Sequence, residues 1–110
     1  MSTAKSHAFV AEYNWDDGLG PIAQIVDDPQ TDFATALMIF WRLDGPFFVS
    51  DSHVNTAAHE LNTRVRANLT SNYYVNRELR YDPVADNGLS RVQLHKMRAD
   101  GVEPVLMDAV

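Results

Sequence analysis

The sequence predicts a single all-α domain, in which about five helices pack around one central apolar helix. Three observations predict this class. Apolar residues recur at helical spacing along most of the chain, and one segment is apolar on nearly every side. The third is composition, because 110 residues with 45% hydrophobic and 22% charged side chains are typical of one globular core. We therefore expect residues 1–110 to form one domain with minor or no strand content.

Two short helices are predicted before the central one. The first covers residues 6–13, where Phe9, Val10 and Tyr13 recur at helical spacing. The segment NWDDGLGP then interrupts the pattern with two glycines and a proline. The second helix lies around residues 22–26 and stops at the sequence DDP, because the residue before a proline avoids helical geometry.

The central helix is predicted over residues 33–43, FATALMIFWRL. Thr31 or Asp32 can cap its first turn by accepting a hydrogen bond from a free backbone N–H. The sequence DGP at residues 44–46 ends it. Because this helix has no polar face, we expect the other helices to surround it.

Two further helices are predicted in the second half. An apolar stripe with a period near 3.6 residues indicates a helix over residues 52–72. Residues 73–81 fit either a short helix or an extended chain, and ADNG predicts a turn. Ser90 can cap a last short helix that ends at Asp100 and Gly101. Its basic segment, RVQLHKMR, is interpreted as a solvated face. The apolar tail, VEPVLMDAV, is expected to dock onto the body.

The pentad NWDDG, Asn14 to Gly18, is predicted to shape a corner between the first two helices. Gly18 permits the backbone reversal, and Trp15 is expected to pack on the central helix. One of Asp16 and Asp17 is predicted to cap the second helix. The other is predicted to pair with Arg42, the only charged residue of the apolar helix, because a buried guanidinium requires a partner. A general acid/base pair of the two aspartates is the functional alternative.

Charge is distributed unevenly. Residues 1–55 hold eight acidic and two basic side chains, net −6, whereas residues 56–110 hold seven of each, net zero. An acidic half repels nucleic acid and suits a basic protein partner, so no nucleic-acid binding is expected. The simpler interpretation is solubility, which acidic surfaces also provide.

Several kinds of functional site are disfavoured. The chain has no cysteine, which excludes thiolate metal sites and fits a reducing cytoplasm. His53 and His59 are six residues apart, whereas zinc-binding helices place two histidines four apart. No phosphate-binding glycine loop, secretory signal or membrane-spanning segment is present. The expectation is therefore a cytoplasmic protein with no metal and no cofactor, and its oligomeric state is left open.

The corner and the segment that follows it carry a resemblance. Besides NWDDG, they include an Asp-x-x-Thr-Ala segment at Asp32, Thr35 and Ala36. With this motif the chain resembles a bacterial domain family of unknown function, number 4274, most firmly over residues 6–46. The resemblance implies the order of helix, corner, short helix and apolar helix. The family has no established activity, so no catalytic residue is carried over.

The leading functional hypothesis is a non-enzymatic immunity protein that neutralises a bacterial toxin by binding it, since small acidic bacterial proteins often have this role. Its partner-binding residues are predicted to be acids and exposed aromatic anchors, namely Asp27, Asp28, Asp44, Asp51, Phe47, Tyr73 and Tyr74. The alternative is a small enzyme or divalent-cation site using Asp16 and Asp17 with His53 or His59. A third possibility, ranked lowest, is an acidic inhibitor that mimics nucleic acid.

Overall fold

The computed structural model describes residues 3–43 and 57–110, apart from the side chains of Thr3 and Asp16. These ranges contain helices and no strand, which confirms the predicted all-α class. None of the helices in them combines the length and the apolar character needed to cross a bilayer. The α-helices are α1 (Thr3–Ala11), α2 (Gly20–Asp27), α3 (Phe33–Arg42), α5 (Ala57–Thr70), α6 (Pro83–Asn87) and α7 (Arg91–Ala99), and the 3-10 turns are η1 (Trp15–Asp17) and η2 (Pro104–Leu106).

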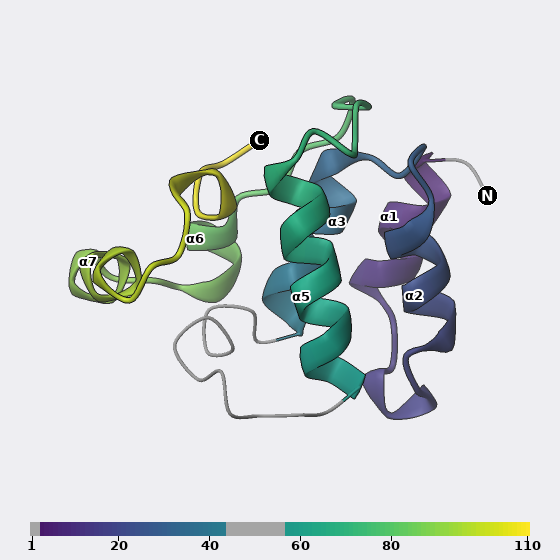
Figure 1. Cartoon of the computed structure of the whole chain (residues 1–110), viewed down its shortest axis with the longest axis horizontal. Helices are drawn as coiled ribbons and strands as arrows, with labels where there is room; N and C mark the ends of the chain where they lie inside the picture. Colours follow the sequence, from purple (N-terminus) through teal and green to yellow (C-terminus); the bar gives the residue numbers. More distant parts are fainter. Residues whose placement is uncertain (1–2, 44–56) are drawn as a thin grey trace.

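Helix α3 lies at the centre, as predicted. It packs against α1, α2, α5 and α6, with α5 in front of it in the view of Figure 1. Every residue from Phe33 to Trp41 is buried, and Arg42 is exposed. Each large apolar side chain buried in this way stabilises the fold by about 1.5–3 kcal/mol. The core of the domain is therefore built around this one helix.

The first turn of α3 is held by Asp32, which confirms one of the two predicted caps. Asp32 is only 1% exposed, and its Oδ1 accepts a hydrogen bond from the N–H of Ala34 at 2.9 Å. Its Oδ2 accepts from the N–H groups of Glu78 and Leu79, at 2.6 and 3.2 Å. Because a buried carboxylate needs such donors, this side chain also ties the chain after α5 to the start of α3.

Helix α5 presents its predicted apolar stripe to the core, where Leu61, Val65 and Leu69 are buried. Its predicted start lies outside the described residues. The chain beyond it, up to Tyr81, forms no regular helix, so the extended alternative is the correct one. Tyr81 and Val110 exchange a pair of backbone hydrogen bonds of 3.3 and 2.9 Å, which hold the end of this segment beside the C-terminal tail.

One helix was not predicted. The segment read as a turn around ADNG is the end of α6, which Asp82 caps by accepting hydrogen bonds from the N–H groups of Val84 and Ala85. Pro83 fits the first helical position, where its missing N–H costs nothing. Gly88, with φ of 59°, ends the helix in the left-handed region. With only five residues, α6 is too short to show a helical period in the sequence.

Helix α7 and the tail confirm their predictions. Ser90 caps α7 in a capping box with Gln93, and the helix ends at Asp100 and Gly101. In the tail, Val102, Leu106 and Met107 are buried. The indole N–H of Trp41 donates to the carbonyl oxygen of Leu106 at 2.7 Å, across 65 residues of sequence. Figure 1 shows this C-terminal part on the side of α3 away from α1 and α2.

Candidate partner-binding face

The NWDDG corner forms the turn η1, and its glycine has the predicted role. Gly18 has φ of 92°, a backbone conformation that is unfavourable for residues with a side chain. The hydroxyl of Tyr13 donates a hydrogen bond of 2.5 Å to the carbonyl oxygen of Gly18. The predicted aspartate cap of α2 is wrong. The cap residue is Leu19, without a side-chain hydrogen bond. The reversal at Gly18 places the cap two residues beyond Asp17, so neither aspartate lies at that position.

Arg42 has a partner that was not predicted. It lies at the last residue of α3, its side chain is 36% exposed, and it pairs with Asp86 of α6 at 3.4 Å. Asp86 also accepts a hydrogen bond of 2.6 Å from the hydroxyl of Tyr81. Burial and this hydrogen bond raise the pKa of Tyr81. The prediction assumed a buried guanidinium, but the helix ends there and the side chain reaches outward to α6.

Three aromatic rings form a continuous strip from α1 to the corner. The ring centroids of Phe9 and Tyr13 are 5.3 Å apart, and those of Tyr13 and Trp15 are 5.5 Å apart in an edge-to-face arrangement. Aromatic pairs favour such geometry. All three rings are half-buried against the core, so one side of each stabilises the fold and another side remains accessible. Trp15 thus packs against the core, and its contact with the central helix itself stays a prediction.

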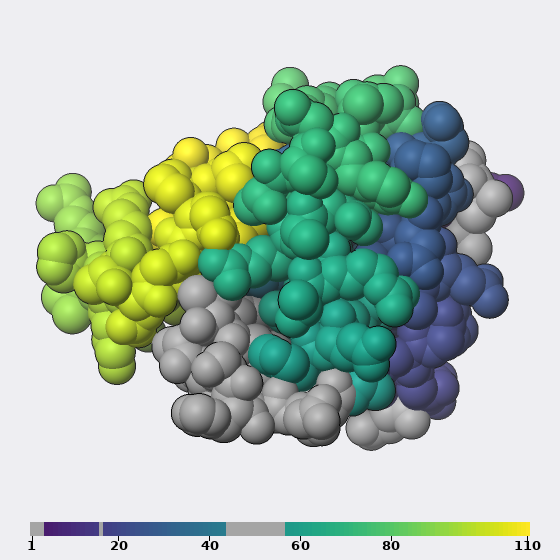
Figure 2. Space-filling model, in the orientation of Figure 1, coloured from purple at the N-terminus to yellow at the C-terminus, as the bar shows by residue number. Residues whose placement is uncertain are grey.

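Exposed acids lie next to this strip in the sequence or line the same groove as Phe9. Glu12 precedes Tyr13, Asp17 follows Trp15, and Asp28 lies beyond α2, and all three are exposed. We call these acids, with the three rings, the acidic–aromatic face: Phe9, Glu12, Tyr13, Trp15, Asp17 and Asp28. In Figure 2, α1 and α2 lie at one end of the molecule and α7 at the other. The sequence signal for the strip is the spacing of four between Phe9 and Tyr13, which was interpreted only as a helical period.

A groove of ≈ 230 Å³ lies between α1 and α2 on this part of the molecule. Phe9 lines it from α1, and Ile25 lines it from α2. Asp28 lines the same groove. Its carboxylate therefore lies at the same groove as Phe9, which is one end of the aromatic strip.

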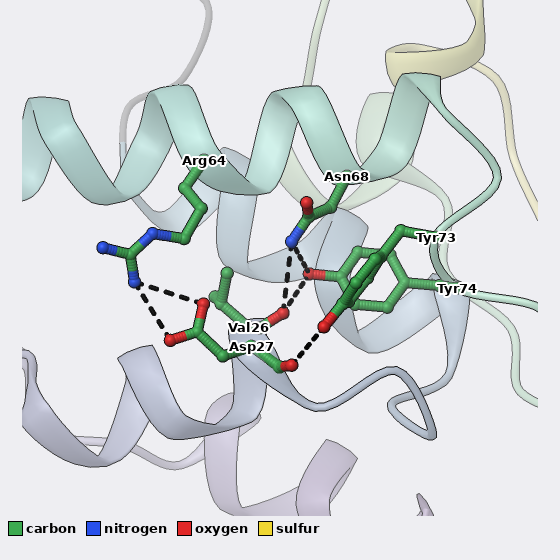
Figure 3. Close-up of polar contacts among 6 residues, drawn as sticks. All are labelled: Val26, Asp27, Arg64, Asn68, Tyr73 and Tyr74. Atoms are coloured by element: carbon green, nitrogen blue, oxygen red, sulfur yellow. Dashed lines mark hydrogen bonds and ion pairs between the residues drawn. The ribbon is translucent and has the colours of Figure 1, made fainter.

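The predicted anchor Tyr74 is not on the surface. It is 1% exposed, and its hydroxyl donates to the carbonyl oxygen of Val26 at 2.5 Å, as Figure 3 shows. Burial raises the pKa of this phenol well above its usual value, which the hydrogen bond to Asn68 only partly opposes. Tyr74 is therefore a structural residue, and its assignment as an exposed anchor is wrong.

The predicted anchor Tyr73 lies beside it and is half-buried. Its hydroxyl donates to the carbonyl oxygen of Asp27. The hydroxyl of Thr31 donates to the carbonyl of Ile25 at 2.6 Å. The last carbonyls of a helix lack partners within it. Three side chains that follow α2 in the sequence thus satisfy three successive carbonyls at its C-terminal end.

Asp27 lies on the surface, but another residue of the same chain already pairs with its carboxylate. Its carboxylate pairs with Arg64 of α5 at 3.1 Å, and both side chains are well exposed (Figure 3). A negative charge at a helix C-terminus is unfavourable, and Arg64 offsets it. Exposed pairs of this kind contribute about 0–1 kcal/mol. Of the predicted acids in the described part of the chain, Asp28 is therefore the one left without an ion pair.

The other predicted positions cannot be placed on this face. Asp44, Phe47, Asp51 and His53 lie outside the described residues, as does the side chain of Asp16. His59 is half-buried on α5. Within residues 3–43 and 57–110, no group of three histidine or acidic side chains could hold a metal ion.

The basic helix α7 is solvated, as predicted. None of its residues is buried, and Val92 is 79% exposed. Its cations Arg91, Lys96 and Arg98 take part in none of the ion pairs found in the described ranges.

No curated protein and no solved structure matches this chain at a significant level. A family model matches residues 1–75, which include α1, α2, α3 and α5 and end just after Tyr74. The acidic–aromatic face lies wholly within this range, whereas α6, α7 and η2 lie beyond it. The chain thus belongs to the family described as Domain of unknown function (DUF4274).

Proposed function

We propose that this protein is a non-enzymatic binding protein that neutralises a basic effector, in the manner of an immunity protein, through its acidic–aromatic face. The observation that carries the proposal is the contact chain of Phe9, Tyr13 and Trp15, with exposed acids near it in the chain that take part in none of the ion pairs found among the described residues. Half-buried aromatic rings supply contact area at little entropic cost, and such residues dominate the binding energy of interfaces.

The charge around this strip determines which partner it suits. From Thr3 to Asp28 the chain holds five acidic side chains and one basic one, Lys5. Surface acids of this kind mainly accelerate association with a basic surface, and their effect weakens as salt screens them. A toxin whose active site binds an anionic substrate presents such a surface, so an acidic inhibitor can cover it.

The test begins with the gene's neighbours. A toxin encoded beside this gene is produced in a susceptible host with and without the protein, and growth is measured. The binding variant carries Glu12→Lys, Asp17→Lys and Asp28→Lys. Its matched control carries Glu78→Lys, Asp100→Lys and Asp108→Lys, which change the charge equally at three exposed acids outside the face. We expect the control to protect the host and the binding variant to fail.

Two results would overturn the proposal. Equal protection by both variants would show that the acidic–aromatic face is not needed for protection. A rise of several degrees in melting temperature with magnesium, calcium, manganese or zinc at modest concentration would instead indicate the divalent-cation alternative, because a ligand that binds only the folded state stabilises it.

A further inference from the structure

The groove between α1 and α2 has two chemically distinct parts. Its apolar wall is formed by Phe9 of α1 with Pro21 and Ile25 of α2. Its polar lining residues are Ser6, Gln24, Asp28 and Thr31, and Asp28 is the charged one. A volume of ≈ 230 Å³ suits one long side chain rather than a helix or a large ligand.

The carboxylate of Asp28 is held in place with one oxygen available. Its Oδ1 accepts the N–H of Gln30 at 2.9 Å. The backbone around it is also fixed, because the N–H of Asp28 donates to Ile25 and its carbonyl accepts from Thr31. Among the described residues no donor is found for Oδ2. The neighbouring Asp27 differs, since Arg64 already occupies its carboxylate.

An aliphatic wall, an aromatic ring and one available carboxylate together match an arginine side chain. Its methylene stem packs on apolar surface while its charged end stays polar. The guanidinium is planar, stacks on aromatic rings and pairs with carboxylates, and it is more weakly hydrated than the ammonium group of lysine. The excess of acids from Thr3 to Asp28 disfavours an anionic occupant.

We propose that the groove between α1 and α2 receives one arginine side chain of a protein partner, stacked on Phe9 and paired with Asp28. The inference rests on the proposed function only for the identity of the partner. The preference of the groove for arginine follows from its own residues.

The test uses the full chain and a small probe, Nα-acetyl-arginine-N-methylamide, followed by amide chemical shifts in NMR. The norleucine and lysine analogues of the same probe serve as comparisons. We expect saturable shifts confined to amides around Phe9, Ile25 and Asp28, with the arginine probe the tightest. Asp28→Asn should weaken binding by up to about fivefold, because one exposed charge pair is lost. Asp108→Asn, at another exposed aspartate, should leave binding unchanged.

Phe9→Leu provides the second arm, because it keeps apolar bulk and removes the ring. It should weaken the arginine probe and leave the norleucine probe unaffected, and a thermal melt shows whether the variant is folded. Equal binding of all three probes, or shifts spread over every exposed acid, would overturn the proposal. Since the probe needs no toxin, binding by the groove in a protein that gives no growth protection would refute the proposed function while supporting the arginine site.

Discussion

The hydroxyl of Tyr74 donates a 2.5 Å hydrogen bond to the carbonyl oxygen of Val26, and so joins the start of the segment that follows α5 to the end of α2. The contact is buried and spans 48 residues of sequence. Asn68 donates to the same carbonyl at 3.4 Å, and to the Tyr74 hydroxyl at 3.2 Å. These two side chains, one on α5 and one just after it, thus satisfy the carbonyl oxygen of Val26 near the C-terminal end of α2.

Tyr74→Phe should lower the free energy of unfolding by about 1–2 kcal/mol, because a buried carbonyl loses its stronger donor and Asn68 remains as a weaker one. Urea denaturation followed by circular dichroism measures the change. Tyr73→Phe is the matched control, since its hydroxyl bonds a carbonyl in an exposed setting where water can replace it. A larger loss in Tyr73→Phe than in Tyr74→Phe would contradict this account.

Asp32→Ala should be among the most destabilising changes, by about 3–5 kcal/mol, because it leaves three backbone N–H donors without their acceptor. Asp32→Asn should have an intermediate effect, since one amide oxygen can still accept. Thermal unfolding of both variants measures the difference. Asp108→Asn, on the surface, should stay within about 0.5 kcal/mol of the unaltered protein. If Asp32→Ala changed the stability as little as Asp108→Asn does, the hydrogen bonds from Asp32 to Glu78 and Leu79 would contribute nothing to the stability of the fold.

Gly18→Ala should destabilise the protein by about 1–2 kcal/mol through backbone strain alone. A side chain there would meet open space, but φ of 92° disfavours any residue with a Cβ atom. Gly18→Asn should cost less, because asparagine tolerates positive φ better than alanine does. Chemical denaturation distinguishes the two variants. Equal losses of stability in the two variants would indicate that the new side chain collides with neighbouring atoms rather than straining the backbone.

Stability should fall below about pH 6.5 because of His7. Its Nδ1 lies 2.9 Å from the hydroxyl of the buried Thr35. Burial lowers the pKa of His7 below its ordinary value of 6.5, and the charge of Asp32 opposes this only in part. As the pH falls through 6.5, the unfolded chain takes up the proton first. The folded state therefore loses stability over that range and keeps it above pH 6.5.

The check is the difference in unfolding free energy between the protein and His7→Gln, measured at pH 7.5 and pH 5.5. The difference should favour the unaltered protein more at pH 7.5. His95→Gln, on the exposed helix α7, shows whether the loss of any histidine has the same effect. A difference that does not depend on pH would exclude His7 as the cause.

Local signals in the sequence predicted most of the helices. Asp32 and Ser90 were identified as caps because a cap depends on residues within one turn. The apolar run from Phe33 to Trp41 predicted its own burial for a similar reason, since a helix without a polar face has nowhere else to lie. The helix α6 was missed because five residues carry no period.

The candidate site was harder to predict because exposure and pairing depend on distant segments. Tyr73 and Tyr74 are adjacent and alike in sequence, yet one is half-buried and the other is in the core. What decides this is the end of α2, nearly fifty residues earlier, whose free carbonyls accept their hydroxyls. The ion pair of Arg42 with Asp86 likewise depends on a contact between α3 and α6, which no local sequence pattern predicts.

The sequence by itself determined the helical class, the central helix, the corner at NWDDG and the acidic charge of the first half. Each of these follows from residue types and spacings within a few turns of the chain. Only the tertiary structure decided which acids remain unpaired and which aromatic rings stay accessible. It joined Phe9, Tyr13 and Trp15 into one strip and left Asp28 beside it, because packing brings α1, the corner and α2 together while Arg64 takes Asp27.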